Sequence, residues 1–404
     1  MNVMITGAQF TNKGAQSLLF SLISQMREHY SDLNIYFLPL DDYQAYDADR
    51  YKFEVVYGKD QALAYAGGMV SRILITTKCV IKSLLKKEHI PLRDIKRYHE
   101  VLGKTDVLID ISGYQLSSKW KLHVNRRYLQ YIENAKKHCA KAILMPQSFG
   151  PFAYGDAQAE MEDRITATLQ NTDLIFAREQ EGAQLLDNLG IKAQVSPDLV
   201  LQTDTIKWEN IFYAEPELNY PVLETKNNVG IIPNFQTFEH GNKEKVLNIY
   251  QDVIRDLLLK RKNVYIFRHS EDLDACKEIY KRSAAEPHVH LIEDELDCLA
   301  YSKFISQFDY IVASRYHAVV HAYKEGIPVV ILGWATKYQE LARHMDQEQY
   351  VFDITGSDDA IGEKVISALE RMERSVGEEK VRIAAGLDRM RRNSCFEYCW
   401  EVIG

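Results

Sequence analysis

Two consecutive apolar segments in the second half of the chain are each followed by cationic side chains. Arg315 and His317 follow the segment Tyr310–Ala313, and Lys337 comes soon after the segment Pro328–Leu332. An arginine binds phosphate or carboxylate through two parallel hydrogen bonds, and a helix that begins at such a point adds N–H groups that attract anions. Each residue alone is explained as a surface cation. The three together predict a site for a small anion.

Two histidines stand four residues apart on one face of the helix expected over His317–Lys324. A pair of histidines at this spacing binds zinc in metalloproteases, where a glutamate lies between them. The residues between His317 and His321 are Ala, Val and Val, and no third ligand is evident. We therefore predict no metal site here, and we assign His321 a buried, supporting role.

The first half of the chain supplies a further cation and a carboxylate. Arg178 follows the apolar segment Leu174–Ala177, where it can either face a ligand or pair locally with Glu181. Asp110 lies inside the apolar segment Val107–Ile111. Because an ionised carboxylate is costly to bury unless it is paired or functional, Asp110 is a candidate for substrate binding or proton transfer.

Three more loops carry polar side chains that are candidate binding residues. They are Asn12 and Lys13 in the loop Gly7–Gly14, Gln147 and Ser148 at the end of Ala142–Gln147, and Arg268 and His269 at the end of Val264–Arg268. The glycines of the first loop form neither GxGxxG nor a P-loop, so nucleotide binding there has weak support. The third loop either holds part of a ligand or caps and charges the helix that follows it.

Short apolar segments alternate with amphipathic helical segments along most of the chain, which is typical of parallel sheets covered on both faces. The expected strands are Asn2–Thr6, Asn34–Leu38, Val107–Ile111, Ala142–Gln147, Leu174–Ala177, Gln194–Val200, Val229–Pro233, Val264–Arg268, Val289–Ile292, Tyr310–Ala313 and Pro328–Leu332. In such sheets ligands bind beyond the carboxyl ends of the strands. The polar loops described above are therefore where we expect chemistry.

The alternation lapses once, in a polar stretch that contains aromatic residues and prolines, and this divides the chain. We predict an α/β protein with an N-terminal Rossmann-like lobe over residues 1–205, a linker over 206–226 and a C-terminal Rossmann-like lobe over 227–385. The last helix, around Arg389–Val402, would pack residues 386–404 back on the first lobe. The length of 404 residues suits two hydrophobic cores.

Composition excludes several classes of protein. The formal net charge of −8 argues against a general nucleic-acid binder. No run of about 18 uncharged apolar residues is present, as a membrane helix would need, and the N-terminus does not resemble a signal peptide. Six cysteines without CxxC spacing fit a reducing, cytoplasmic setting. The basic stretch between Arg72 and Arg97 is either a solvated helix edge or an interfacial helix attracted to anionic lipid.

Seven segments together resemble the polysaccharide pyruvyl transferase family. They are TNKGAQSLL, VLIDISG, ILMPQSFGPF, FAREQEG, SPDLVL, SRYHAVVHAYKEGIPVV and WATKYQEL. The resemblance implies a GT-B-like architecture, with two lobes facing a cleft. It also implies transfer of the enolpyruvyl carbons of phosphoenolpyruvate to two hydroxyls of a sugar, which gives a cyclic ketal. No cofactor is implied. The family's strand near Asp110 often ends in several glycines, whereas this chain has only Gly113 there, followed by Tyr114.

The resemblance also implies roles for the residues above. The donor-handling set is Arg178, Ser314, Arg315, His317 and Lys337, with Arg268 and His269 as further donor-side residues; the acceptor-side residues are Asn12, Lys13, Gln147 and Ser148. His317, Arg178 and Asp110 are the expected catalytic residues, with Asp110 binding or deprotonating the acceptor. That acceptor is expected to be a hexose in a lipid-linked precursor of a surface polysaccharide or capsule, handled in the cytoplasm at the inner face of the membrane.

Two alternatives remain open at this point. One is a GT-B glycosyltransferase that uses a nucleotide sugar, for which Glu340 is the carboxylate available to bind a ribose. The other is a non-catalytic sugar- or anion-binding protein of the same fold, which leaves the cations of the two lobes without a task.

Overall fold

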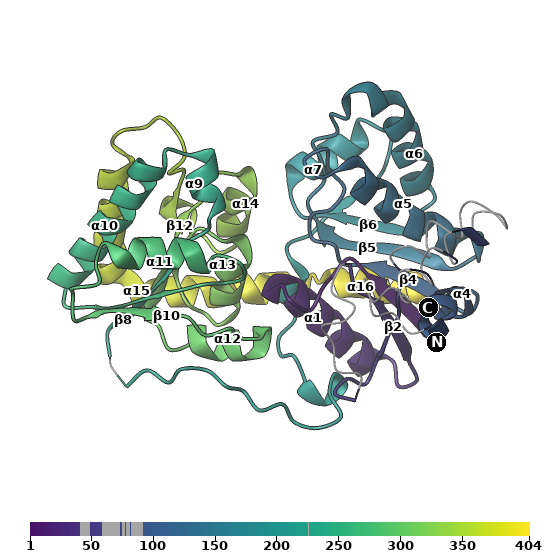
Figure 1. The fold of residues 1–404 in the computed structure, drawn as a ribbon, viewed down its shortest axis with the longest axis horizontal. Coiled ribbons are helices and arrows are strands. Elements are labelled where there is room, and N and C mark those ends of the chain that lie inside the picture. Colours follow the sequence, from purple (N-terminus) through teal and green to yellow (C-terminus); the bar gives the residue numbers. More distant parts are fainter. Residues whose placement is uncertain (41–48, 59–72, 75–76, 78–80, 82–91, 225) are drawn as a thin grey trace. The chain divides into compact units, whose positions relative to one another are not determined.

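The computed structural model describes residues 1–40, 49–58, 73–74, 77, 81, 92–224 and 226–404. The chain forms two compact α/β units (Figure 1). The first unit contains Met1–Leu199, Thr203–Pro216 and Ser394–Gly404, and the second contains Val200–Gln202 and Glu217–Asn393. The second unit is therefore inserted, in chain order, before the last segment of the first.

The first unit is built on a seven-stranded sheet in the order β3-β2-β1-β4-β5-β6-β7, and every pairing in it is parallel. Its strands are β1 (Asn2–Thr6), β2 (Asn34–Leu38), β3 (Glu54–Val55), β4 (Val107–Asp110), β5 (Lys141–Gln147), β6 (Leu174–Ala177) and β7 (Gln194–Val195). Its helices are α1 (Lys13–His29), α4 (Leu92–Leu102), α5 (Leu122–Lys137), α6 (Gln158–Gln170), α7 (Gln180–Asp187) and α16 (Cys395–Ile403), and α8 (Leu199–Gln202) follows β7.

The second unit has a six-stranded parallel sheet in the order β10-β9-β8-β11-β12-β13. Its strands are β8 (Asn228–Ile232), β9 (Asn263–Phe267), β10 (Val289–Ile292), β11 (Tyr310–Ala313), β12 (Val329–Leu332) and β13 (Val351–Phe352). Its helices are α9 (Gln236–His240), α10 (Lys243–Leu259), α11 (Leu273–Lys281), α12 (Cys298–Ile305), α13 (Tyr316–Lys324), α14 (Thr336–His344) and α15 (Ile361–Arg392).

Side chains that alternate along the strands of the second sheet pack against helices on both of its faces. Val229 and Ile231 on β8 belong to one core cluster with residues of α10, α11 and α15. Phe267, at the end of β9, lies outside that cluster and contacts Phe304 of α12, with ring centroids 4.9 Å apart. Successive strand residues point to opposite faces, so the apolar runs seen in the sequence are those of strands buried on both sides.

Each sheet reverses its strand order at one place, which fixes where a ligand is expected. In the first unit the reversal lies between β1 and β4, and in the second it lies between β8 and β11. Ligands of doubly wound sheets bind outside the carboxyl ends of the strands at such a switch point. Gly7 follows β1 there with a φ of +96°, and a Cβ on it would lie 2.5 Å from the Ser112 nitrogen after β4. Only glycine allows the two loops to approach so closely.

Two elements expected from the sequence are different in the structure. The strand expected over Gln194–Val200 ends at Val195, because Pro197 has no N–H for the ladder and the chain turns into α8. The helix expected around Arg389–Val402 is two helices. α15 ends at Arg392, and α16 begins after Ser394, whose side chain accepts a hydrogen bond from the Phe396 nitrogen.

The two units differ from the predicted domain limits at two places. Residues 206–216 of the predicted linker belong to the first unit, and the expected boundary at residue 385 falls inside α15.

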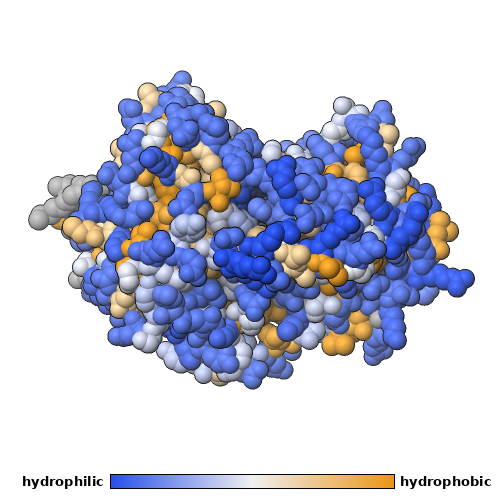
Figure 2. All heavy atoms as spheres, turned by 180° about the vertical axis from the view of Figure 1, so that it is seen from behind, coloured by the Kyte–Doolittle hydropathy of each residue, from blue (hydrophilic) through white to orange (hydrophobic). Residues whose placement is uncertain are grey.

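The basic stretch between Arg72 and Arg97 lies largely outside the described residues. None of the helices in the described part of the chain has the length and apolar character needed to cross a bilayer. On the face shown in Figure 2, hydrophilic residues predominate and apolar residues form small separate patches.

Candidate functional site

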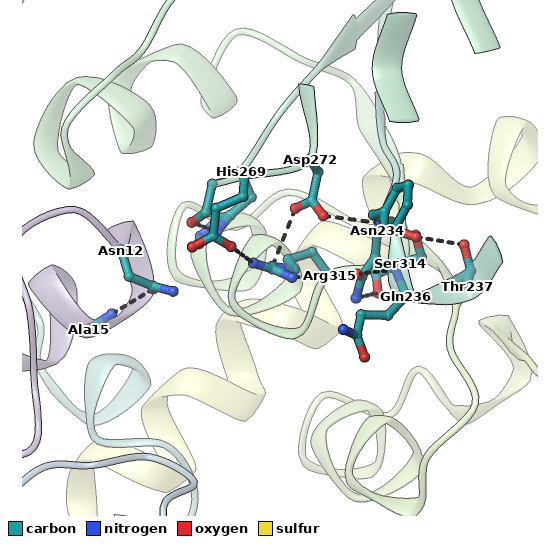
Figure 3. Close-up of polar contacts among 12 residues, drawn as sticks. Asn12, Ala15, Asn234, Gln236, Thr237, His269, Asp272, Ser314 and Arg315 are labelled. Atoms are coloured by element: carbon teal, nitrogen blue, oxygen red, sulfur yellow. Dashed lines mark hydrogen bonds and ion pairs between the residues drawn. The ribbon is translucent and has the colours of Figure 1, made fainter. Parts of the chain in front are cut away.

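The switch point of the second sheet brings together residues from three strand ends. Asn234 follows β8, Asp272 lies in the loop after β9, and Arg315 follows β11 (Figure 3). Arg315 is the N-cap residue of α13, with extended backbone, so its side chain leaves the chain at the positive end of that helix dipole. The predicted convergence of polar groups at the carboxyl edge of this sheet therefore has a definite centre at Arg315.

The Arg315 guanidinium is held by three polar neighbours. Its Nη1 donates to Asn234 Oδ1 at 3.4 Å, and its Nη2 donates to Glu271 Oε2 at 3.2 Å. Its Nε lies 3.4 Å from Asp272 Oδ2. Asp272 is buried, whereas the Glu271 side chain is 80% exposed. Asp272 therefore fixes the arginine in place, and Glu271 is its weakly held, solvent-exposed partner.

Ser314 precedes Arg315 and is fully buried. Its hydroxyl lies 2.9 Å from the Tyr250 hydroxyl, on the core side of the sheet. Its carbonyl oxygen accepts hydrogen bonds from Tyr338 Oη at 2.8 Å and from Asn234 Nδ2 at 3.2 Å. The structure thus places Ser314 as a support that ties the Arg315 turn to α10, α14 and the β8 loop.

Three histidines form a row behind the start of α13. The ring of His317 lies nearly parallel to that of His269, with centroids 6.3 Å apart and planes at 20°. The His269 ring lies 5.7 Å from that of His321, and Tyr301 contacts both of the inner histidines. His269 and His321 are each 1% exposed, whereas His317 is partly exposed. His317 is therefore the member of the row that can meet a ligand.

Lys337 lies in the first turn of α14, next to two tyrosines. Its Nζ is 5.3 Å from the ring centroid of Tyr316 and 5.7 Å from that of Tyr338. Tyr338 also donates to the Ser314 carbonyl, so the residues after β11 and β12 share one aromatic support. Burial raises the pKa of the Tyr338 hydroxyl. It therefore stays a neutral hydrogen-bond donor at neutral pH.

Arg268 and His269 follow β9 but point to different partners. Arg268 Nη2 donates to the Glu293 carbonyl at 3.4 Å and to Glu295 Oε2 at 3.2 Å, which ties it to the loop after β10. His269 Nδ1 lies 3.0 Å from Ser270 Oγ. His269 is joined to the histidine row, and Arg268 is held toward the neighbouring strand end.

Arg178, in the first unit, is almost fully buried in an ion-pair network. Its Nη1 donates to Asp198 Oδ2 at 2.9 Å, its Nε to Glu179 Oε1 at 3.1 Å, and its Nη2 to Ser148 Oγ at 2.7 Å. Ser148 Oγ in turn donates to Glu179 Oε1 at 2.8 Å. The ion pair that the sequence suggested between Arg178 and Glu181 is replaced by ion pairs of Arg178 with Glu179 and Asp198. All three guanidinium nitrogens have protein partners, so Arg178 and Ser148 join the loops after β5, β6 and β7.

Asp110 ends β4 and is 2% exposed. Its Oδ1 accepts from the Ser112 nitrogen and from Gln147 Nε2, each at 3.1 Å, and its Oδ2 accepts from Ser112 Oγ at 2.8 Å. Burial raises the pKa of Asp110 to about 7, although these hydrogen bonds work against the rise. Gln147 is fully buried and also accepts from Tyr128 Oη at 3.1 Å. Gln147 therefore positions Asp110.

The loop after β1 contains the two remaining residues of the predicted set. Asn12 is the N-cap of α1, and its side-chain oxygen accepts from the Ala15 nitrogen at 3.2 Å (Figure 3). Lys13 is buried in the first turn of the same helix. Both residues thus have local structural positions at the carboxyl edge of the first sheet. In the part of the chain that the structure describes, no group of three or more His, Cys, Asp or Glu could hold a metal ion.

The sequence analysis does not single out Asn234, which contacts Arg315, or Ser112, which contacts Asp110, as functional residues. Asn234 follows an expected strand, so the rule that polar loops follow strands could have found it. Ser112 stands directly after the expected strand Val107–Ile111, so the same rule applies to it.

The two parallel sheets give the chain the fold of α/β proteins of the GT-B class. A putative UDP-N-acetylglucosamine 2-epimerase from Listeria monocytogenes has a TM-score of 0.57 at 12% identity, covering 95% of this chain and 90% of that chain. The UDP-GlcNAc 2-epimerase from Neisseria meningitidis bound to UDP-GlcNAc has a TM-score of 0.52 at 14% identity, covering 95% and 94%. Sequence identities this low support a conclusion about the fold alone. A search of curated proteins gave no significant match.

The family follows from the sequence model described as polysaccharide pyruvyl transferase, which matches residues 12–336. The match covers most of the 404 residues, includes Arg178 and Arg315, and ends directly before Lys337. The chain belongs to the polysaccharide pyruvyl transferase family. The family resemblance inferred from the seven segments and the GT-B-like fold are both confirmed.

Proposed function

We propose that this transferase moves the enolpyruvyl group of phosphoenolpyruvate to two hydroxyls of a hexose in a precursor of a surface polysaccharide. The observation that carries the proposal is the Arg315 centre, where a guanidinium, a partly exposed histidine and a lysine follow adjacent parallel strands of the second unit. Phosphoenolpyruvate presents a phosphate and a carboxylate on three carbons. Several cations on one sheet edge suit such a compact polyanion.

In this proposal the second unit binds the donor. Arg315 binds the phosphate through the Nη atoms that now face Asn234 and Glu271, and the first N–H groups of α13 add to the attraction. Lys337 binds the other anionic group. Ser314, Asn234 and Tyr338 position the turn without touching the donor. Arg268 and His269 support the same edge, His269 by packing behind His317.

His317 is the proposed proton donor to the donor's methylene carbon and a ligand of its phosphate. An imidazole changes charge near neutral pH, which suits a group that must give a proton in one step and regain it later. Protonation of that carbon produces an oxocarbenium-like centre. One sugar hydroxyl attacks this centre, phosphate leaves, and the second hydroxyl closes the ketal.

The acceptor side of the proposal rests on the first unit. Asp110 has the raised pKa that a general base near neutral pH needs. The loops around it contain Asn12, Lys13, Gln147 and Ser148, and Arg178 holds the loops after β5 and β6 in place.

We place the reaction in the cytoplasm, with a lipid-linked acceptor at the inner membrane face. The basic stretch between Arg72 and Arg97 supports this location, and flotation with anionic vesicles tests it.

Ligand-dependent thermal stability tests the donor. Phosphoenolpyruvate at millimolar concentration is expected to raise the Tm of the protein, because binding to the native state alone stabilises it. Uridine and guanosine diphosphate sugars are the comparison. Product mass after incubation with phosphoenolpyruvate and p-nitrophenyl hexosides, or with lipid-linked sugars, then tests transfer. Stabilisation by a nucleotide sugar without any by phosphoenolpyruvate would identify a glycosyltransferase instead.

Glu271→Gln is expected to tighten phosphoenolpyruvate binding by up to about fivefold. The exposed Glu271 carboxylate competes for Arg315 Nη2, and an exposed ion pair of this kind is worth up to about 1 kcal/mol. Isothermal titration calorimetry at low salt measures the change. Glu295→Gln is the matched control, because Glu295 is an exposed partner of Arg268 rather than of Arg315. Equal affinities for wild type and Glu271→Gln would remove Arg315 Nη2 from the donor contacts.

A further inference from the structure

Partly buried hydrogen bonds connect Asp110 through Ser112 to Gln115 in the loop after β4. Asp110 is buried at the end of β4, and its Oδ2 accepts a hydrogen bond from Ser112 Oγ at 2.8 Å. Ser112 is partly exposed. A sugar outside the sheet therefore has no direct path to the Asp110 carboxylate, whereas the hydroxyl that contacts this carboxylate lies nearer the surface.

The Ser112 hydroxyl is held in a defined place. Its backbone nitrogen donates to Asp110 Oδ1 at 3.1 Å, and its Oγ also contacts Gln115 Oε1 at 2.8 Å. Gly7 packs so closely that a Cβ there would lie 2.4 Å from Ser112 Oγ. Backbone and side chain are thus fixed from three directions, at the switch point of the sheet.

The direction of the hydrogen bond from the Ser112 hydroxyl depends on the charge of Asp110. A hydroxyl has one proton, and Ser112 Oγ has two acceptors at the same distance, Asp110 Oδ2 and Gln115 Oε1. When Asp110 is ionised, the proton goes to the charged acceptor, which forms the stronger bond. When Asp110 carries a proton, it donates to Ser112 Oγ, and Ser112 donates to Gln115. The ionised state leaves the lone pairs of Ser112 Oγ open to a new donor.

In the part of the chain that the structure describes, the groups hydrogen-bonded to the Asp110 carboxyl are uncharged. Thr6 on β1 lies beside it in register, Gln147 comes from β5, and Tyr128 comes from α5. Burial raises the pKa of Tyr128, so that hydroxyl stays neutral. Because these described partners include no cation, Asp110 can take up and release a proton near neutral pH.

We propose that Ser112 is the catalytic residue that touches the acceptor, and that Asp110 acts through it as the proton store. The inference rests on the proposed function. As the sugar oxygen bonds to the donor's central carbon, its proton passes to Ser112 Oγ, and the Ser112 proton passes to Asp110 Oδ2. Over the full reaction the two hydroxyl protons are accounted for, because one ends on the new methyl group and the other on the released phosphate.

Three variants and a pH profile test the pathway. Ser112→Ala is expected to lower kcat/KM for pyruvyl transfer to a p-nitrophenyl hexoside by about 10²–10⁴-fold. In wild type, kcat/KM should fall as the pH drops below about 7, the pKa of Asp110. Asp110→Asn keeps the hydrogen bonds of the protonated carboxyl and should lower kcat/KM across the pH range, and the residual activity should lack this acidic limb. Ser118→Ala is the control, since Ser118 is in the same loop but bonds to the Pro151 carbonyl.

A measurement without an acceptor separates this inference from the proposed function. The titration of the Asp110 carboxyl, followed by ¹³C NMR with Asp110→Asn for assignment, should move to higher pH in Ser112→Ala, because a donor to the carboxylate is lost. It should not move in Ser118→Ala. An unmoved titration, or an unchanged pH profile in an active Ser112→Ala enzyme, overturns the pathway. Failure of phosphoenolpyruvate to bind overturns the proposed function while leaving the titration result intact.

Discussion

Replacing His317 with alanine is expected to lower kcat/KM by about 10²–10⁴-fold while the fold remains intact, which is the usual contribution of a positioned proton donor. His317 is the partly exposed member of the histidine row, and it lies in the first turn of α13 beside Arg315. Its removal takes away both a phosphate ligand and the proton for the methylene carbon. Phosphate release from phosphoenolpyruvate in the presence of a hexoside measures the loss.

His288→Ala is the matched control, because His288 is exposed and contacts Asn263 through Nδ1. Circular dichroism and thermal unfolding should be alike for the two variants and the wild type. His317→Gln, which restores a hydrogen-bonding group without an acid of suitable pKa, should recover donor binding but not turnover. A near-wild-type rate for His317→Ala would exclude this residue from the mechanism.

Arg178→Ala is expected to reduce the free energy of unfolding by about 3–5 kcal/mol, because it leaves buried carboxylates without their cation. Asp198 is fully buried and Glu179 nearly so, and both bond to the Arg178 guanidinium. Urea unfolding measures the change.

The control for Arg178 is Arg126→Ala, which breaks the exposed pair with Glu160 and should cost at most about 1 kcal/mol. The double variant Arg178→Met with Asp198→Asn should recover part of the stability, since one buried charge is removed along with the cation. A stable Arg178→Ala protein that no longer binds phosphoenolpyruvate would restore this arginine to the direct donor contacts implied by the family resemblance.

The parts of the fold that were predictable from the sequence are those set by local patterns. The apolar runs of β1, β4, β6 and β11 are strands because their residues are buried on both faces. The position of Arg315 and His317 after β11 was predictable because the direction of a parallel strand decides at which edge of the sheet the following loop lies. The strand expected through Val200 ends at Val195 instead, because Pro197 has no N–H to continue the ladder.

The parts that were not predictable depend on contacts between distant segments. Arg178 meets Asp198, 20 residues further on, because β6 and β7 are neighbours in the sheet. Asp110 meets Gln147, 37 residues away, across the β4–β5 pair. The sequence shows which charged and polar side chains are present, but not which of them form ion pairs or hydrogen bonds with each other. For this reason the charge of Arg178 was visible in the sequence, and its partners were not.

The return of α16 to the first unit has a consequence for synthesis on the ribosome. Cys399 contacts Met145 on β5, Trp400 stacks on His29, and Lys141 binds the Val402 and Ile403 carbonyls. The first 216 residues therefore emerge with an uncovered strip on β5 and β6, which stays open until α16 has been translated. The second unit is a continuous stretch from Glu217 to Asn393, apart from three residues, and can complete its own packing earlier. The first unit, although its synthesis begins earlier, is thus the later of the two to close.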